Sequence, residues 1–219
     1  MTTARTPAKR TDRKRERTRG ELVVAAETLV AQRGLDAISI DDITQAADVA
    51  KGTFYTHFAD KTDLAAAIAL RTRLELEEKI TALNKGLTDA PERMANGLSS
   101  MFAFAIANPM RARALLRLQP GIVDPNAPIN AGLRGDIVLG LKTERFSAPS
   151  LDAAVVTTIG GALSAILRMS VMSERRASAP FELAAHIVEM LLVALGVKHS
   201  EAARLASAAL TARKQETKL

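Results

Sequence analysis

Residues 40–64 decide the fold class of this chain, and they read IDDITQAADVAKGTFYTHFADKTDL. Ser39 precedes this segment and Asp42 follows Ser39 by three positions, which predicts a capping box at the start of a short helix. After a short break, a second short helix is predicted from Lys51 to about Phe58. Two short helices joined by a tight turn are typical of a helix-turn-helix, whose second helix enters the DNA major groove.

The spacing of two aromatic residues indicates which face of the second helix is buried. Phe54 and Phe58 are four positions apart, so both are expected to pack into the core of a small domain. A preceding helix over residues 18–33, ended by Gly34, supplies the partner surface. The rest of the second helix then faces solvent, and this face comprises Lys51, Gly52, Thr53, Tyr55, Thr56 and His57.

The segment Lys-Gly-Thr-Phe-Tyr, the following His-Phe pair and the Asp-Lys before the next helix resemble the DNA-binding module of the tetracycline-repressor (TetR) family over roughly residues 18–65. This resemblance implies phosphate contacts from Tyr55 and Lys61, and a C-terminal domain for ligand binding and dimerisation. The predicted DNA-binding residues are Ser39, Thr44, Lys51, Gly52, Thr53, Tyr55, Thr56, His57 and Lys61. A solvated helix surface is the alternative for each of them; it is preferred for Thr44 and remains open for Thr56 and His57.

The positive charge of the chain is concentrated at the N-terminus. Residues 1–19 hold eight Lys or Arg side chains and two acidic ones, which accounts for the whole net charge of +6. We therefore predict a flexible basic arm over residues 1–17 that contacts the DNA backbone or minor groove. A solvated tail that only aids solubility is the alternative.

Composition favours an all-α fold, because aromatic residues make up 3% of the chain and no strand-like alternation occurs. We expect a helix-turn-helix domain over residues 18–65 and a larger helical regulatory and dimerisation domain over residues 66–214. The chain contains no cysteine, which excludes disulfides and suits the cytoplasm. No metal or cofactor is expected.

The predicted regulatory domain contains six helices, with starts at Asp89-Ala90-Pro91, Pro109, residue 128, the capping segment Ser147-Ala148-Pro149-Ser150, Ser178 to Pro180, and Ser200. The helix after residue 128 is expected to run to about 144, and the one after Ser150 to about Met172. Apolar side chains on these helices predict an effector pocket formed by Leu98, Met101, Phe102, Leu115, Leu118, Ile137, Leu141, Arg168 and Met169. The alternative is a filled core, and Arg168 could instead extend to the surface. The predicted dimer interface is formed by Val155, Ile159, Leu163, Ile187, Met190 and Leu191, some of which are also expected in the core.

Other classes of protein fit the sequence less well. The three histidines lie in unrelated contexts and no phosphate loop or HExxH motif occurs, so no enzyme is predicted. Asp152 and Arg168 interrupt the apolar segment 151–172, which argues against a membrane span. The expected function is a homodimeric repressor that binds a palindromic operator and is released by a small apolar or amphipathic molecule. A helical adaptor or a nonspecific DNA-binding protein without ligand sensing is the alternative.

Overall fold

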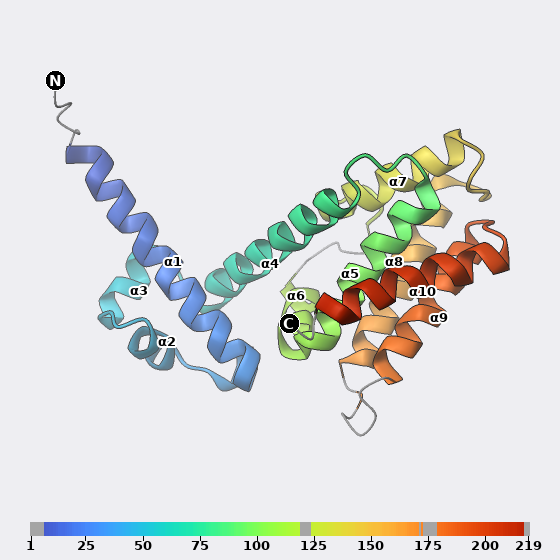
Figure 1. Cartoon of the computed structure of the whole chain (residues 1–219). Coiled ribbons are helices and arrows are strands. Elements are labelled where there is room, and N and C mark those ends of the chain that lie inside the picture. The colour runs from blue at the N-terminus through green and yellow to red at the C-terminus, as the bar shows by residue number, and fades with distance from the viewer. Residues whose placement is uncertain (1–6, 119–123, 171, 173–178, 217–219) are drawn as a thin grey trace. The chain divides into compact units, whose positions relative to one another are not determined.

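The computed structural model describes residues 7–118, 124–170, 172 and 179–216, and for residues 7–11, 114, 117 and 118 it describes the backbone alone. Regular structure in these ranges is entirely helical, which confirms the predicted all-α fold class (Figure 1). The α-helices are α1 (Pro7–Arg33), α2 (Ile40–Ala46), α3 (Lys51–His57), α4 (Lys61–Leu83), α5 (Ala90–Ala107), α6 (Pro109–Leu118), α7 (Ala131–Lys142), α8 (Leu151–Met169), α9 (Ala179–Ala194) and α10 (His199–Glu216). Two short 3-10 helices, η1 (Leu35–Ala37) and η2 (Pro128–Asn130), precede α2 and α7.

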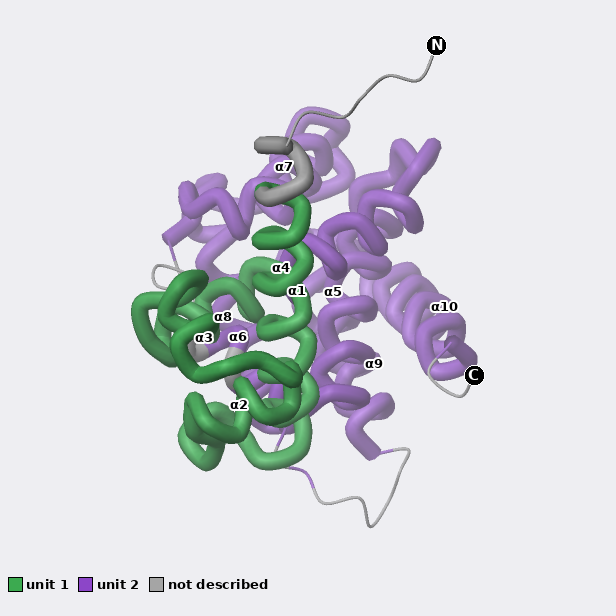
Figure 2. Tube along the Cα trace, turned by 90° about the vertical axis from the view of Figure 1, so that its left-hand side faces the viewer, with its two compact units in different colours: residues 1–71 green, residues 72–219 purple. Residues whose placement is uncertain are grey.

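The chain divides into two compact units, residues 1–71 and residues 72–219 (Figure 2). The division falls within α4, so this one helix contributes residues to both units. Our sequence-based domain boundary after residue 65 also lies within α4.

The first unit is built around the two aromatic residues that the sequence singled out. Phe54 and Phe58 are fully buried, with ring centroids 5.7 Å apart, as their spacing predicts. They share this core with buried residues of α1, α2 and α4, namely Leu22, Val23, Ala26, Val30, Ile43, Leu64, Ala65 and Ile68. Helix α3 is therefore fixed by its apolar face, which leaves its polar face outward.

The start of α2 and the turn before α3 follow local backbone chemistry. The Ser39 hydroxyl accepts from the Asp42 amide at 3.1 Å and the Asp42 carboxylate accepts from the Ser39 amide at 2.8 Å, so the predicted capping box is present. In the turn, Asp48 has φ of +53°, a left-handed conformation that Asp tolerates better than most residues. The Val49 amide donates to the Thr44 carbonyl at 3.0 Å and closes the turn.

Helix α1 begins well before the predicted residue 18. It starts at Pro7, and proline suits the first position of a helix because it needs no amide donor there. Residues 7–17 are rich in Lys and Arg, which are good helix formers, and Arg17 pairs with Glu21 one turn later at 3.3 Å. Most of the expected flexible arm is thus a helical extension, while residues 1–6 lie outside the described residues.

The core of the second unit is formed mainly by α5, α8, α9 and α10 (Figure 1). Phe102, Val155, Val188 and Leu192 are among its fully buried residues. Two predicted helix caps are confirmed, because the Asp89 carboxylate accepts from the Glu92 amide and the Ser150 hydroxyl from the Ala153 amide.

Two predicted helix ends differ from the structure. The segment expected as one helix over residues 128–144 is η2 followed by α7, which stops at Lys142 because Glu144 adopts φ of +57°. Helix α8 ends at Met169 rather than at Met172, and the Ser170 hydroxyl there accepts from Arg113 Nε at 3.0 Å.

Helix α8 has 19 residues and a mean hydropathy of 1.4, and among the described helices it is the one with the length and composition to cross a membrane. A single such helix is weak evidence, because the core helix of a globular domain has the same composition. Val155, Ile159 and Ile166 are among the residues of α8 that are buried in the second unit. We therefore assign α8 to the core of that unit.

Candidate functional site

The exposed face of α3 is the first candidate site, and its residues are positioned by the burial of Phe54 and Phe58. Lys51, Gly52, Tyr55 and Thr56 are exposed, whereas Thr53 and His57 are half-buried. Tyr55 is 54% exposed although it is aromatic, so its ring and hydroxyl are presented outward from the helix. A tyrosine presented outward in this way can contact a phosphate through its hydroxyl.

Lys51 at the start of α3 and Lys61 at the start of α4 have partners within the first unit. Lys51 Nζ lies 2.8 Å from Asp41 Oδ1, and this hydrogen-bonded carboxylate raises the pKa of the Lys51 ammonium. Lys61 Nζ donates to the carbonyl oxygen of Ile38 at 3.1 Å and is half-buried. Both ammonium groups are therefore held close to the N-terminal end of α2.

Thr44 of α2 and Ser39, which precedes α2, both form hydrogen bonds with residues of this helix. Thr44 is 5% exposed and its hydroxyl donates to the Asp41 carbonyl at 3.2 Å, so the prediction that it offers a hydroxyl to DNA disagrees with its burial. Ser39 is exposed, but its hydroxyl donates to Asp42 Oδ2 at 2.7 Å within the capping box. The hydrogen bonds from Ser39, followed by one from Arg33, lower the pKa of Asp42 to about 2.

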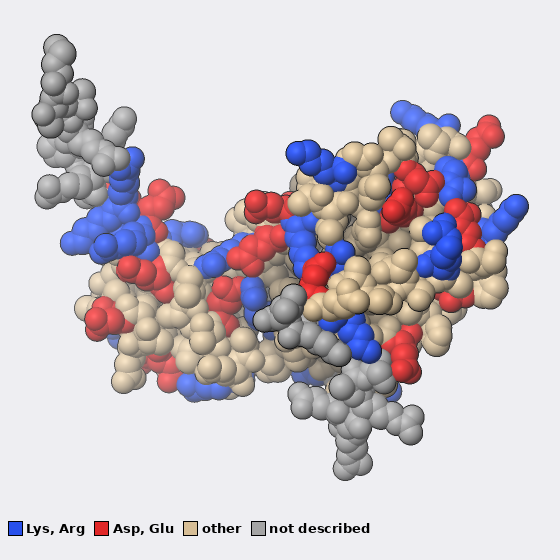
Figure 3. All heavy atoms as spheres, viewed as in Figure 1, with Lys and Arg blue, Asp and Glu red and all other residues tan. Residues whose placement is uncertain are grey.

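The helical extension of α1 carries the most basic surface of the first unit. Lys and Arg side chains cluster on it in Figure 3, and Arg13, Lys14, Arg15, Arg17 and Arg19 are all exposed. This surface adjoins α3, because two of its guanidinium groups contact the end of that helix.

Arg15 Nη2 donates to the Thr56 carbonyl at 3.4 Å, and the Arg19 guanidinium lies 4.8 Å from the centre of the Phe58 ring. Burial, followed by the charges of Arg15 and Arg19, lowers the pKa of His57, so His57 adds little positive charge at neutral pH. The sequence analysis did not predict the contacts of Arg15 and Arg19 with the end of α3, because it treated the arm as flexible. The available signal was the spacing of these two residues, which are four positions apart and therefore lie on one helical face.

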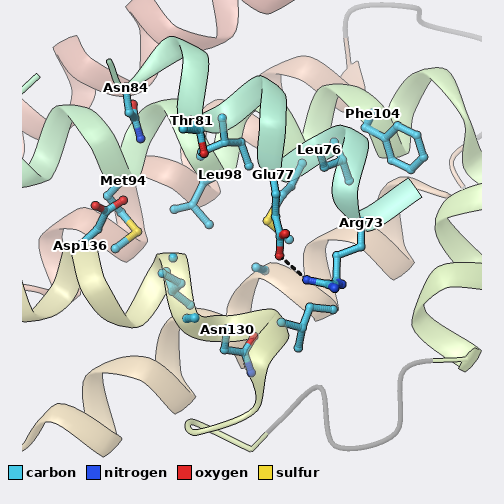
Figure 4. Close-up of a pocket in the computed structure, with 18 of the residues that line it drawn as sticks. Arg73, Leu76, Glu77, Thr81, Asn84, Met94, Leu98, Phe104, Asn130 and Asp136 are labelled. Carbon is cyan, nitrogen blue, oxygen red and sulfur yellow. Dashed lines mark hydrogen bonds and ion pairs between the residues drawn. The ribbon is translucent and has the colours of Figure 1, made fainter. Parts of the chain in front are cut away.

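The second candidate site is a cavity of about 1300 Å³ inside the second unit (Figure 4). Residues from α4, α5, α6, η2, α7 and α8 line it. Most of the lining is apolar, with Leu76, Leu98, Phe104, Ile159 and Leu163 as examples. Binding sites for small molecules are typically 300–1000 Å³ and mainly apolar with a few polar groups, so this cavity can hold a molecule of drug size or larger.

Four charged residues of the cavity lining form two ion pairs. Arg93 Nε lies 2.7 Å from Asp136 Oδ1, and Arg73 Nη1 lies 2.6 Å from Glu77 Oε1. In Figure 4, Asp136 lies toward one end of the labelled side chains and the Arg73–Glu77 pair toward the other. Burial raises the pKa of Asp136, and the hydrogen bond from Arg93 opposes this effect.

The predicted pocket residues have mixed outcomes. Leu98, Met101 and Leu115 line the cavity. Phe102 and Ile137 are fully buried in the core instead, Leu141 and Met169 are also absent from the lining, and the Leu118 side chain lies outside the described residues. Arg168 was expected at the pocket, but it is exposed on the outer face of α8.

Sequence reasoning missed the contribution of α4 to this cavity. Arg73, Leu76, Glu77 and Ile80 of α4 all line it, together with Asn130 at the end of η2. The available signal was the Arg73 and Glu77 spacing of four residues, which is also the pattern of an ordinary surface pair.

The predicted interface residues also lie in mixed positions. Val155, Ile159 and Leu191 are buried within the unit, and Leu191 packs against Gly161, where no side chain intervenes. Ile159 and Leu163 line the cavity. Met190, however, is 66% exposed.

Together, a helix-turn-helix with an outward basic and aromatic face and a second unit with a large apolar cavity define a DNA-binding regulator that responds to a small molecule. The family model described as bacterial regulatory proteins of the tetR family matches residues 22–68. A second model, described as the tetracyclin repressor-like C-terminal domain, matches residues 89–208. The chain therefore belongs to the TetR family and is a ligand-responsive, DNA-binding transcriptional regulator.

The relatives with a known direction of regulation include a probable repressor and an activator. A probable acrEF/envCD operon repressor of Escherichia coli strain K12 is 29% identical over 187 residues, which cover 76% of this chain and 81% of that protein. The transcriptional activator FasR of Mycolicibacterium smegmatis is 30% identical over 90 residues, 41% of each chain.

Solved structures with the same fold include a protein bound to a small ligand. The crystal structure of RolR in complex with resorcinol is 28% identical and superimposes with a TM-score of 0.62 over 90% of this chain and 96% of that one. A γ-butyrolactone receptor is 20% identical, with a TM-score of 0.62 over 92% and 99% of the two chains, and shares the fold. These findings do not support the alternative of a helical adaptor or a nonspecific DNA-binding protein without ligand sensing.

Proposed function

We propose that this regulator is a homodimeric repressor that binds a palindromic operator and is released when a small apolar or amphipathic molecule occupies the cavity of the second unit. The observation that carries the proposal is the position of α4. This helix contributes Leu64 and Ile68 to the core of the first unit and Leu76 and Ile80 to the cavity lining of the second. A ligand that displaces the second half of α4 therefore acts on a helix that also anchors the DNA-binding unit.

The proposed DNA contacts come from α3 and its flanks. Lys51 and Thr53, at the start of α3, are proposed to contact base edges, and Gly52 would allow close approach because it has no side chain and faces open space. Tyr55, Thr56, His57, Lys61 and Ser39 are assigned to the phosphates or to the rim of the interface. For Lys61 this requires exchange of its bond to the Ile38 carbonyl for one to a phosphate.

The basic extension of α1 is proposed to bind the DNA backbone. Its exposed Lys and Arg side chains adjoin α3 through the Arg15 contact with Thr56. Contacts of this kind raise affinity and salt dependence without reading sequence.

The proposed dimer uses the outer face of α8 and α9. Val156, Leu167, Met190 and Val193 are large apolar side chains that are exposed on these two helices. Apolar residues gathered on two helices favour a helical interface between copies of a chain, and two-fold symmetry is required to read two operator half-sites.

The proposed release of DNA depends on a difference in the affinity of the effector for two conformations of the protein. An effector releases DNA only if it binds more tightly to the conformation in which the two recognition helices do not match the operator. Because the target is DNA, we propose that the protein acts in the cytoplasm.

The direction of regulation is tested by deleting the gene and measuring transcripts of its neighbours in cells that normally express the protein. A repressor predicts that its target transcripts rise, and that wild-type protein lowers them again while the double variant Lys51→Ala, Thr53→Ala does not. A fall in the same transcripts would show an activator instead, and unchanged transcripts would contradict a regulatory role.

A further inference from the structure

Among the charged residues that line the cavity, the Arg93–Asp136 pair has the most hydrogen bonds. Arg93 donates from Nε to Asp136 Oδ1 at 2.7 Å and from Nη1 to the carbonyls of Asn84 and Leu87 at 3.2 and 3.3 Å. Asn84 in turn donates to the Arg93 carbonyl at 3.2 Å. The guanidinium and the carboxylate are therefore held in place before any ligand arrives.

This pair retains capacity for further hydrogen bonds. Within the described residues, Asp136 Oδ2 accepts no hydrogen bond and Arg93 Nη2 donates none. Both residues line the cavity, so an acceptor and a donor are available at the same place. A hydroxyl group both donates and accepts, and it can satisfy the two atoms together.

The charges of the lining disfavour an ionised ligand. Arg73 is paired with Glu77 and Arg93 with Asp136, so each half-buried cation of the lining already has a carboxylate partner. Lys85 and Glu78 also line the cavity, but both are exposed and therefore screened by water. A carboxylate brought to the Asp136 end would lie beside a like charge without an available counterion, which is costly in an apolar site.

We propose that the effector is a neutral, largely apolar molecule with a hydroxyl group that binds the Arg93–Asp136 pair while its apolar body packs against Leu98, Ile159 and Leu163. This inference rests on the proposed function, since it names the chemical class of the effector for the same cavity. Hydroxylated ring systems and hydrophobic alcohols fit this class, whereas fatty acids and other apolar carboxylates do not.

The test uses three probes with one skeleton: naphthalene, 2-naphthol and 2-naphthoate. The chain has no tryptophan, so naphthyl fluorescence can be followed directly during titration of the purified full-length protein. We expect 2-naphthol to bind roughly tenfold more tightly than either other probe, because it adds a charge-assisted hydrogen bond without an unpaired charge. In Asp136→Asn this preference should fall to about twofold, because a neutral acceptor bonds more weakly.

Asp152→Asn is the matched control, since it makes the same substitution at an exposed carboxylate of the second unit that does not line the cavity, and it should leave the preference unchanged. Equal or tighter binding of 2-naphthoate, loss of the preference in Asp152→Asn, its retention in Asp136→Asn, or no binding of any probe would each overturn the inference. If Asp136→Asn does not fold, the ranking of the probes by the wild-type protein decides. DNA binding is measured in a separate experiment, so a wrong ligand class would not change the result for the operator. A protein that ranks the probes as expected but binds no DNA would contradict only the proposed function.

Discussion

At the scale of single residues, a polar side chain close to a helix start can form a hydrogen bond either with the protein's own backbone or with a ligand. Thr44 and Ser39 both carry a hydroxyl that could bind a phosphate. The Thr44 hydroxyl, however, is buried and donates to the Asp41 carbonyl, and the Ser39 hydroxyl caps α2. Short hydroxyl side chains bind nearby backbone groups readily, which a sequence pattern does not reveal. The burial of Phe54 and Phe58, by contrast, follows from spacing alone.

Tyr55→Phe should weaken binding to operator and to random duplex DNA by the same factor, about fivefold, because it removes one hydroxyl contact to phosphate. The ring is exposed, so the fold should be unaffected. Fluorescence anisotropy with both duplexes at one stated salt concentration measures the two ratios. Thr53→Ala is the comparison, expected to change the preferred sequence, and a loss confined to the operator in Tyr55→Phe would show a base contact instead.

The capping box predicts a pH dependence of stability. Because the pKa of Asp42 is lowered from 3.8 to about 2, its ionised form is favoured by the folded state, so its contribution is complete above the unfolded pKa. That contribution is lost as the pH falls from about 4 toward about 2. Urea unfolding should therefore separate wild type from Asp42→Ala clearly near neutral pH and progressively less below pH of about 4. A separation that is constant with pH would contradict the assigned role.

At the scale of helices, the basic extension of α1 makes a quantitative prediction about salt. Arg13→Gln with Lys14→Gln removes two exposed cations, so the slope of log affinity against log salt should become shallower by about one for each phosphate that the variant no longer neutralises. The double variant Lys142→Gln, Lys198→Gln removes two exposed cations of the second unit and serves as the control. Identical slopes for all three proteins would exclude binding of the DNA backbone by the extension.

The exposed apolar face of α8 and α9 predicts the oligomeric state. Leu167→Glu with Met190→Glu places two charges in the proposed interface, and the dimer dissociation constant should rise by roughly a hundredfold or more because unpaired buried charges are costly. Sedimentation equilibrium measures this change. Val24→Glu places a charge on an exposed apolar site of α1 and should leave a dimer intact; a wild-type monomer would contradict the proposal.

Helix starts were predictable because their signals are local. Ser39, Asp89 and Ser150 each cap the helix that their sequence position indicated. The cavity was not predictable to the same extent, because its lining combines side chains from helices that are distant in sequence, and Arg73 of α4 gives no local sign that it faces the same space as Ile159 of α8. The helical state of residues 7–17 was missed because a dense run of charge was interpreted as disorder.

At the scale of the whole molecule, α4 is the element on which the proposed regulation depends. Its first half packs in the DNA-binding unit and its second half lines the cavity, so one continuous helix belongs to both sites. Whatever ligand binds, the coupling must be reciprocal, and operator DNA should weaken effector binding by the same factor by which the effector weakens DNA binding.

The most direct test of a dimer that reads an operator through α3 is selection of bound sequences from a pool of random DNA duplexes by the purified full-length protein. We predict an enriched palindrome whose half-sites are spaced by about one helical turn, the separation that two symmetry-related α3 helices require. A single unpaired site, or no enrichment from folded protein, would contradict such a dimer.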